Sequence, residues 1–142
     1  MLSNPFTGQT IEFVSDTDDL LVIESSYRAG GAPAPPHLHP AQEERFTVLA
    51  GAVETVIDGE PRTLRKGDTL VIPAGTPHVF GGHASEPGTV RWEVRPALRT
   101  REFFERMFAA LEANANPDTS GAQEAIAAFD LADYEDVFRL AV

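Results

Sequence analysis

The sequence predicts an all-β barrel of antiparallel strands followed by a helical C-terminal extension. Most of the first 96 residues consist of short segments of alternating character, separated by glycine and proline. The pair Asp58-Gly59, which follows one such segment, is a strong signal for a β-hairpin. Beyond Pro96 the spacing of apolar residues changes to that of one helical face. Together these observations favour a barrel in residues 1–96 and helices in residues 97–142.

Five segments of the first part are expected to form strands. They combine β-branched or other apolar residues with nearby turn residues, which is typical of strands. They are residues 10–14, 20–27, 53–57, 68–73 and 89–94. Many short strands with glycine and proline between them indicate a sandwich or a closed barrel.

The extension is expected to pack on the barrel as part of the same single domain. Thr100 can cap a first helix. The apolar face of that helix would be Phe103, Phe104, Met107, Phe108 and Leu111. Ser120 and Gln123 form a capping-box pattern for a second, shorter helix. Its apolar face would be Ala125, Ile126 and Phe129. Residues 137–142 fit either a strand or a packed tail.

Length and composition exclude several classes of protein. A chain of 142 residues is expected to form one domain. It has no cysteine, which excludes disulfides, thiolate zinc sites and a cysteine nucleophile. The net charge of −11 argues against nucleic-acid binding, because an acidic surface repels phosphates. The N-terminal residues lack the pattern of a signal peptide, and no apolar run is long enough to span a membrane. We therefore expect a cytoplasmic protein.

Three of the four histidines are candidate metal ligands. His37 and His39 are two positions apart, so on a strand both imidazoles point to the same face. His78 follows a turn rich in proline and glycine and would come from a separate hairpin. The fourth, His83, is out of phase with His78 and Phe80 and is expected on the surface or in a loop. A histidine must be neutral to bind metal, so affinity should fall as the pH falls.

Two adjacent glutamates compete for the role of carboxylate ligand. Counting alternate residues from His39 favours Glu43, but Pro40 interrupts any strand in between. Counting from the other side favours Glu44, which is in phase with the apolar residues Phe46 and Val48. We therefore expect Glu44 to point inward and Glu43 to face water.

The spacing of these residues resembles the two motifs of the cupin superfamily. The first motif matches Gly31-x5-His37-x-His39-x4-Glu44-x6-Gly51, and the second matches Gly67-x5-Pro73-x-Gly75-x2-His78. The resemblance implies a small single-domain jelly-roll barrel that holds four metal ligands near one mouth. Those ligands would be His37, His39, Glu44 and His78. The second motif usually ends in Asn, which is not a ligand, and Gly82 takes that place here.

This ligand set suits one divalent transition metal ion, namely Fe, Mn, Ni, Cu, Co or Zn. Open coordination positions could hold water, oxygen or a chelating substrate. We expect a metal-dependent enzyme that acts on a small aromatic or enolisable molecule, either as a dioxygenase or as a polyketide cyclase or isomerase. Glu44 is also a candidate catalytic group. The alternative is a non-catalytic cupin that binds a small molecule or a structural metal.

Five apolar residues are expected to line a substrate pocket, or else simply to fill a small barrel. They are Phe46, Val48, Ile72, Phe80 and Trp92. Four charged strand residues are weaker candidates for acid–base or anchoring roles, because most such residues face water. They are Glu24, Arg91, Glu93 and Arg95. Since small cupins commonly pair near the N-terminus, residues 10–14 are expected to support a homodimer.

Overall fold

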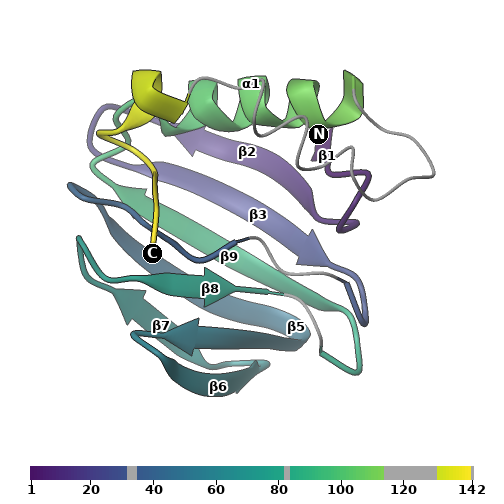
Figure 1. The fold of residues 1–142 in the computed structure, drawn as a ribbon. Coiled ribbons are helices and arrows are strands. Elements are labelled where there is room, and N and C mark those ends of the chain that lie inside the picture. The colour runs from purple at the N-terminus through teal and green to yellow at the C-terminus, as the bar shows by residue number, and fades with distance from the viewer. Residues whose placement is uncertain (32–34, 82–83, 114–130, 142) are drawn as a thin grey trace.

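The computed structural model shows two antiparallel sheets that share one long strand (Figure 1). It describes residues 1–31, 35–81, 84–113 and 131–141. The shared strand is β5 (Glu43–Ile57). Its first part, up to Gly51, pairs with β9 (Gly88–Arg95) and β7 (Thr69–Ile72). Its second part pairs with β6 (Glu60–Arg65) and β8 (His78–Phe80).

The remaining strands extend the two sheets outward. On the first sheet β9 is followed by β3 (Leu21–Tyr27), β2 (Thr10–Asp16) and β1 (Leu2–Ser3). On the second sheet β8 is followed by β4 (His37–Leu38) and β10 (Arg139–Leu140). Every pairing among the described strands is antiparallel. The predicted jelly-roll architecture is therefore confirmed.

The change of sheet within β5 depends on a glycine. The pairing with β9 shifts register between Val48 and Ala50, and Gly51 then adopts a φ of 67°. A Cβ atom at Gly51 would lie 1.8 Å from the carbonyl oxygen of Pro87, so no other residue fits there. The sequence suggested a separate strand at residues 53–57. The structure shows instead that these residues continue β5 beyond this bend.

The predicted hairpin turn lies between β5 and β6. Asp58 and Gly59 have φ angles of 50° and 82°, as a tight turn with two left-handed residues requires. Pro61 is tolerated in β6 because, among the described strands, β6 pairs on one side only, with β5. The Asp58-Gly59 signal therefore identified the turn correctly.

The helix α1 (Thr100–Ala113) lies against β1 along one side of the barrel (Figure 1). Its expected apolar face is buried, except that Phe104 is only half-buried. The expectation that Thr100 caps this helix was wrong. Its hydroxyl oxygen instead accepts a hydrogen bond of 2.6 Å from Nε2 of Gln42, which is itself buried. The second expected helix, at residues 120–129, lies outside the described residues.

The C-terminal segment returns from the helix to the barrel. It begins with a short 3-10 helix, η1 (Leu131–Tyr134), and ends in β10 beside β4 (Figure 1). Val137 is buried, whereas the two residues of β10 are exposed. Residues 137–141 thus combine a packed tail with a short strand. Among the described helices none is both long and apolar enough to cross a membrane.

Candidate metal centre

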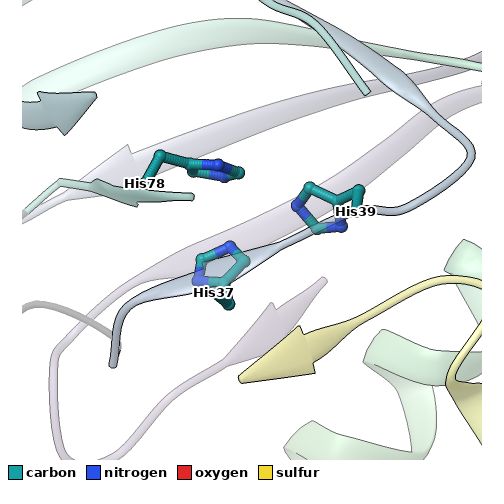
Figure 2. A group of neighbouring side chains, drawn as sticks. All are labelled: His37, His39 and His78. Carbon is teal, nitrogen blue, oxygen red and sulfur yellow. The ribbon is translucent and has the colours of Figure 1, made fainter. Parts of the chain in front are cut away.

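The three motif histidines lie close together at the second sheet (Figure 2). His37 on β4 lies directly opposite His78, the first residue of β8. His39 follows β4, and its carbonyl accepts a hydrogen bond from the Gly75 amide in the turn before β8. One ring nitrogen from each histidine lies within 4.8 Å of the others. His39 and His78 are buried, and His37 is half-buried.

Each histidine ring is oriented by a backbone carbonyl at Nδ1. The acceptors are Pro35 for His37 at 2.9 Å, Val137 for His39 at 2.7 Å and Thr76 for His78 at 2.8 Å. A carbonyl oxygen can only accept, so Nδ1 carries the hydrogen in each ring. In the neutral ring Nε2 therefore keeps its lone pair, which is the arrangement found in metal-binding histidines.

Glu44 brings a carboxylate to the same point. Its Oε1 atom lies 3.0 Å from Nε2 of His39 and 3.1 Å from Nε2 of His78. Its Oε2 atom accepts a hydrogen bond of 2.7 Å from Nε1 of Trp92. Glu44 is only 1% exposed, whereas the neighbouring Glu43 is exposed. The structure therefore groups the three histidines, places Glu44 beside two of them, His39 and His78, and leaves Glu43 outside.

The electrostatics of the cluster follow from burial and proximity. Burial lowers the pKa of His37 to about 3, and the neighbouring histidines add to this effect, so its ring is neutral. Burial opposes the charged form of both Glu44 and His39, but their mutual attraction outweighs it. The pKa of His39 is therefore raised, and the pKa of Glu44 is lowered. This protein thus keeps a negative carboxylate inside the barrel.

Two atoms at this point are buried without a hydrogen-bond partner among the described residues. They are Nε2 of His39 and Oε1 of Glu44. They lie 3.0 Å from each other. Such buried groups cost about 1–3 kcal/mol each when nothing pairs with them. Two ligand atoms bound about 2.1 Å from one ion at a right angle lie about 3.0 Å apart. The donor set therefore fits a divalent transition metal ion.

The five residues expected to line a pocket all point into the barrel. Their exposures are 2% for Phe46, 1% for Val48, 1% for Ile72, 8% for Phe80 and 5% for Trp92. Phe46 stacks on Phe80 at 3.8 Å and on Trp92 at 5.4 Å between ring centroids. These rings fill much of the interior next to Glu44. Trp92 has the additional function of holding the Glu44 carboxylate.

The four charged strand residues do not reach this centre. Glu24, Arg91 and Arg95 are exposed. Glu93 is half-buried on the outer face of β9 and lies 3.8 Å from Arg91 and 3.6 Å from Arg95. The alternation of β9 places Arg91, Glu93 and Arg95 on the opposite face from Trp92, and Glu24 on β3 pairs with Arg91. The remaining candidate, His83, lies outside the described residues.

A small polar network inside the barrel was not predicted from the sequence. Nε2 of Gln9 donates to the hydroxyl oxygens of Ser25, at 3.1 Å, and Tyr27, at 3.3 Å. Burial raises the pKa of Tyr27, and the negative charge of Glu44 contributes to the increase. Ser25 and Tyr27 are in phase with the buried residues Leu21 and Ile23. That period of two was the signal that could have identified them.

Two residues of the C-terminal segment also contact the candidate metal ligands, and neither was predicted from the sequence. The carbonyl of Val137 faces His39, and the ring of Phe138 stacks on His37. Val137 and His39 are 98 positions apart in the sequence. No spacing or motif connects such distant residues, so the sequence carries no signal for these contacts.

Comparison with known proteins finds relatives of the barrel segment. A family model described as "Cupin domain" matches residues 24–92. The quercetin 2,3-dioxygenase of Bacillus subtilis is 41% identical over 64 residues, which are 45% of this chain and 19% of that enzyme. The pectin degradation protein KdgF of Dickeya dadantii is 33% identical over 79 residues, which are 56% of this chain and 69% of that protein.

The similarity extends to solved structures. The structure of KdgF from a Halomonas species superposes with a TM-score of 0.57 at 29% identity. The superposition covers 63% of this chain and 81% of that one. The match to the Bacillus enzyme spans about a fifth of its length, so it concerns the barrel alone. On the family match, the identity to the Dickeya protein and the shared fold, this chain belongs to the cupin family.

Proposed function

We propose that this protein binds one divalent transition metal ion and uses it to convert a small organic substrate. The ligand atoms would be Nε2 of His37, His39 and His78 and Oε1 of Glu44. One observation carries the proposal. Three histidine ring nitrogens lie within 4.8 Å of one another, a buried carboxylate oxygen lies beside Nε2 of two of these rings, and each of the three Nδ1 atoms is already bonded to the backbone. Iron, manganese, nickel, copper, cobalt and zinc all accept this donor set.

The residues around the ligands determine what a bound ion could do. The ion would polarise a carbonyl or enol oxygen of the substrate, and a redox-active ion would also support oxidation by dioxygen. Four protein ligands leave one or two positions open on an ion that accepts five or six. Trp92 and the three carbonyl acceptors hold the ligands in place before the substrate arrives.

The lining of the barrel favours a planar or aromatic substrate. Phe46, Phe80 and Trp92 present stacked rings close to Glu44. Tyr27 lies against Phe80, with 5.7 Å between ring centroids. Because burial raises the pKa of Tyr27, its hydroxyl stays protonated and can donate a hydrogen bond to a substrate oxygen. An aromatic or enolisable molecule with an oxygen for the metal and another for Tyr27 suits these groups.

Dioxygenase chemistry is the leading reaction class. It is supported by the aromatic interior and by the 41% identity of the barrel segment to a quercetin 2,3-dioxygenase. A cyclase or isomerase reaction through a metal-stabilised enolate is the second candidate, such as the cyclisation of a polyketide. The barrel is not similar to dioxygenases alone, because a protein named as a dimethylsulfoniopropionate lyase is 39% identical over 72 residues. A non-catalytic cupin that only binds its ligand is the third.

The test uses the whole chain loaded separately with each of these metals. Oxygen uptake and product mass would be measured with quercetin, a catechol and an enediol as first probes. We expect turnover with at least one metal, lost in Glu44→Gln and retained in Glu43→Gln. Glu43 is a matched control because it is adjacent and exposed. Turnover without oxygen uptake would favour the enolate reaction. Binding of a probe without turnover would support the non-catalytic alternative.

We also propose that the protein forms a homodimer through its N-terminal strands. The proposal rests on β1, which ends the first sheet beyond β2 and pairs with no further strand among the described residues. Light scattering should give about twice the chain mass of 15.4 kDa, and a particle with the mass of one chain would contradict it.

A further inference from the structure

We propose that the C-terminal strap, residues 134–141, positions two of the metal ligands and so forms part of the metal centre. The proposal deepens the metal-binding function above and rests on it. The strap crosses from α1 to the histidine strand β4 and ends beside it as β10 (Figures 1 and 2). It lies outside residues 24–92, the part of the chain that matches the cupin family model. It is thus an addition that the motifs do not describe.

The strap orients His39 through a buried backbone hydrogen bond. Nδ1 of His39 donates to the carbonyl oxygen of Val137 at 2.7 Å. Both residues are buried, with exposures of 6% for His39 and 1% for Val137. The amide of Val137 in turn donates to the carbonyl of Tyr134 at 2.8 Å, which stabilises the turn of the chain there. The strap therefore determines which nitrogen of His39 faces Glu44.

The strap orients His37 through an aromatic stack. The ring of Phe138 lies 4.6 Å from that of His37 at an interplanar angle of 20°. It also stacks on Phe103 of α1, at 5.0 Å and 24°. His37 is half-buried. The Phe138 ring therefore covers the face of the His37 ring that His39 and His78 leave open. Rotation of His37 away from the centre would require Phe138 to move.

The backbone of the strap supports the same strand. Leu140 pairs with His37, and Arg139 pairs with Leu38. The amide of Ala141 donates to the carbonyl of Pro36 at 2.9 Å. The strand that carries His37 is thus bordered by β8 on one side and by the strap on the other. Both neighbours contact a metal-ligand candidate.

The start of the strap is attached to α1. The hydroxyl of Tyr134, which is only 1% exposed, donates to Oε2 of Glu102 at 2.9 Å. The guanidinium of Arg99 lies 4.5 Å from the centre of the Tyr134 ring and 3.5 Å from the carboxylate of Asp136. A firmly attached strap can hold a ligand in place, whereas a loose tail could not. This makes Val137 and Phe138 positioning residues.

Substitutions of Phe138 test this inference in the full-length protein. Cobalt(II) affinity would be measured by chelator competition, together with the visible spectrum of the bound ion and the melting temperature without metal. We expect Phe138→Ala to weaken affinity by about 10–100-fold, as for other residues that orient metal ligands, and to change the spectrum. Phe138→Tyr, which keeps the ring, should restore both.

Two further variants distinguish positioning from general stability. Phe13→Ala is the matched control. Phe13 is also partly buried, but it lies on β2 and packs under the side chain of Arg101 from α1. It should leave cobalt affinity within about twofold. Phe138→Leu keeps an apolar side chain in the core if the alanine variant fails to fold, and it should still weaken cobalt binding.

The outcomes separate this inference from the proposed function. If the unmodified chain binds neither cobalt nor any other candidate ion, the metal-binding function itself is wrong. If the unmodified chain binds cobalt and the folded Ala or Leu variant binds it equally well with the same spectrum, the strap does not position the ligands. A loss of affinity that Phe13→Ala reproduces would likewise overturn the inference, because it would reflect stability alone.

Discussion

Two carboxylates of the first sheet, Glu44 and Glu93, each lie between two basic side chains. The neighbours are His39 and His78 at 3.0 and 3.1 Å for Glu44, and Arg91 and Arg95 at 3.8 and 3.6 Å for Glu93. The side chain of Glu44 is 2% exposed on the inner face, and that of Glu93 is 14% exposed on the outer face. Their strands, β5 and β9, pair with each other.

The difference shows what makes one of these pairs a candidate metal site. An arginine stays charged and has no lone pair to give, so Glu93 is already paired with permanent cations. A histidine can lose its proton and present Nε2, so the cluster around Glu44 can exchange a proton for a metal ion. Burial then makes that exchange selective, because an unpaired charge inside the barrel is costly.

The largest expected effect comes from removing a ligand on the inner face. His78→Ala should weaken metal affinity by more than about 100-fold, beyond the loss typical of residues that only orient a ligand. Glu93→Gln is the control on the outer face and should leave metal affinity unchanged. Chelator competition on both variants would measure the difference, and equal affinities would remove the contrast between the two faces.

Trp92→Phe should weaken metal affinity by about 10–100-fold. The indole N–H is the hydrogen-bond donor to Oε2 of Glu44 at 2.7 Å, and phenylalanine keeps the ring without the donor. The carboxylate could then rotate, since one of its oxygens would lose its partner. The same competition assay measures this effect. Unchanged affinity in a folded variant would show that Trp92 only fills the barrel.

Metal affinity should fall as the pH falls, by about tenfold per pH unit wherever one bound proton must leave for each metal ion. Glu44 raises the pKa of His39 against the effect of burial, so the proton on this ring persists to higher pH than usual. Metal affinity should therefore change steeply with pH below the raised pKa of His39 and become nearly independent of pH above it. Titrations at several pH values would measure it, and an affinity independent of pH across the imidazole range would contradict the assignment of His39.

The smallest effect is expected on the outer face. Glu93→Gln should change the free energy of unfolding by no more than about 1 kcal/mol, because ion pairs near the surface contribute little. Urea denaturation would measure the change, which should also shrink at higher salt. A larger loss would mean that the Arg91–Glu93–Arg95 group has a structural role comparable to that of the inner cluster.

Much of the fold and of the inner cluster could be predicted because the relevant signals are local. The Asp58-Gly59 turn needs two adjacent left-handed residues, and short sequence stretches reveal that requirement. Glu44 could be distinguished from Glu43 because Phe46 and Val48 report which face of the strand is buried. The motif spacing then identified His78 as a neighbour of Glu44 that is distant in the sequence.

Other features could not be predicted, because they depend on contacts between distant segments. At the bend of β5, the carbonyl of Pro87 on a neighbouring loop leaves no room for a side chain at Gly51. The hydroxyl of Thr100 was expected to cap a helix, but it accepts a hydrogen bond from Gln42, which lies directly before β5. The contact of Val137 with His39 belongs to the same class. Local patterns carry no information about any of these partners.

The most direct test of the metal centre is the metal content of the purified protein, per chain, beside that of the His78→Ala variant. Elemental analysis should find close to one transition metal ion per chain in the unmodified protein and almost none in the variant. The identity of that ion would then direct the search for a substrate. If neither protein holds metal, even after each candidate ion is added back, the convergence of His37, His39, Glu44 and His78 serves another purpose and the central claim is wrong.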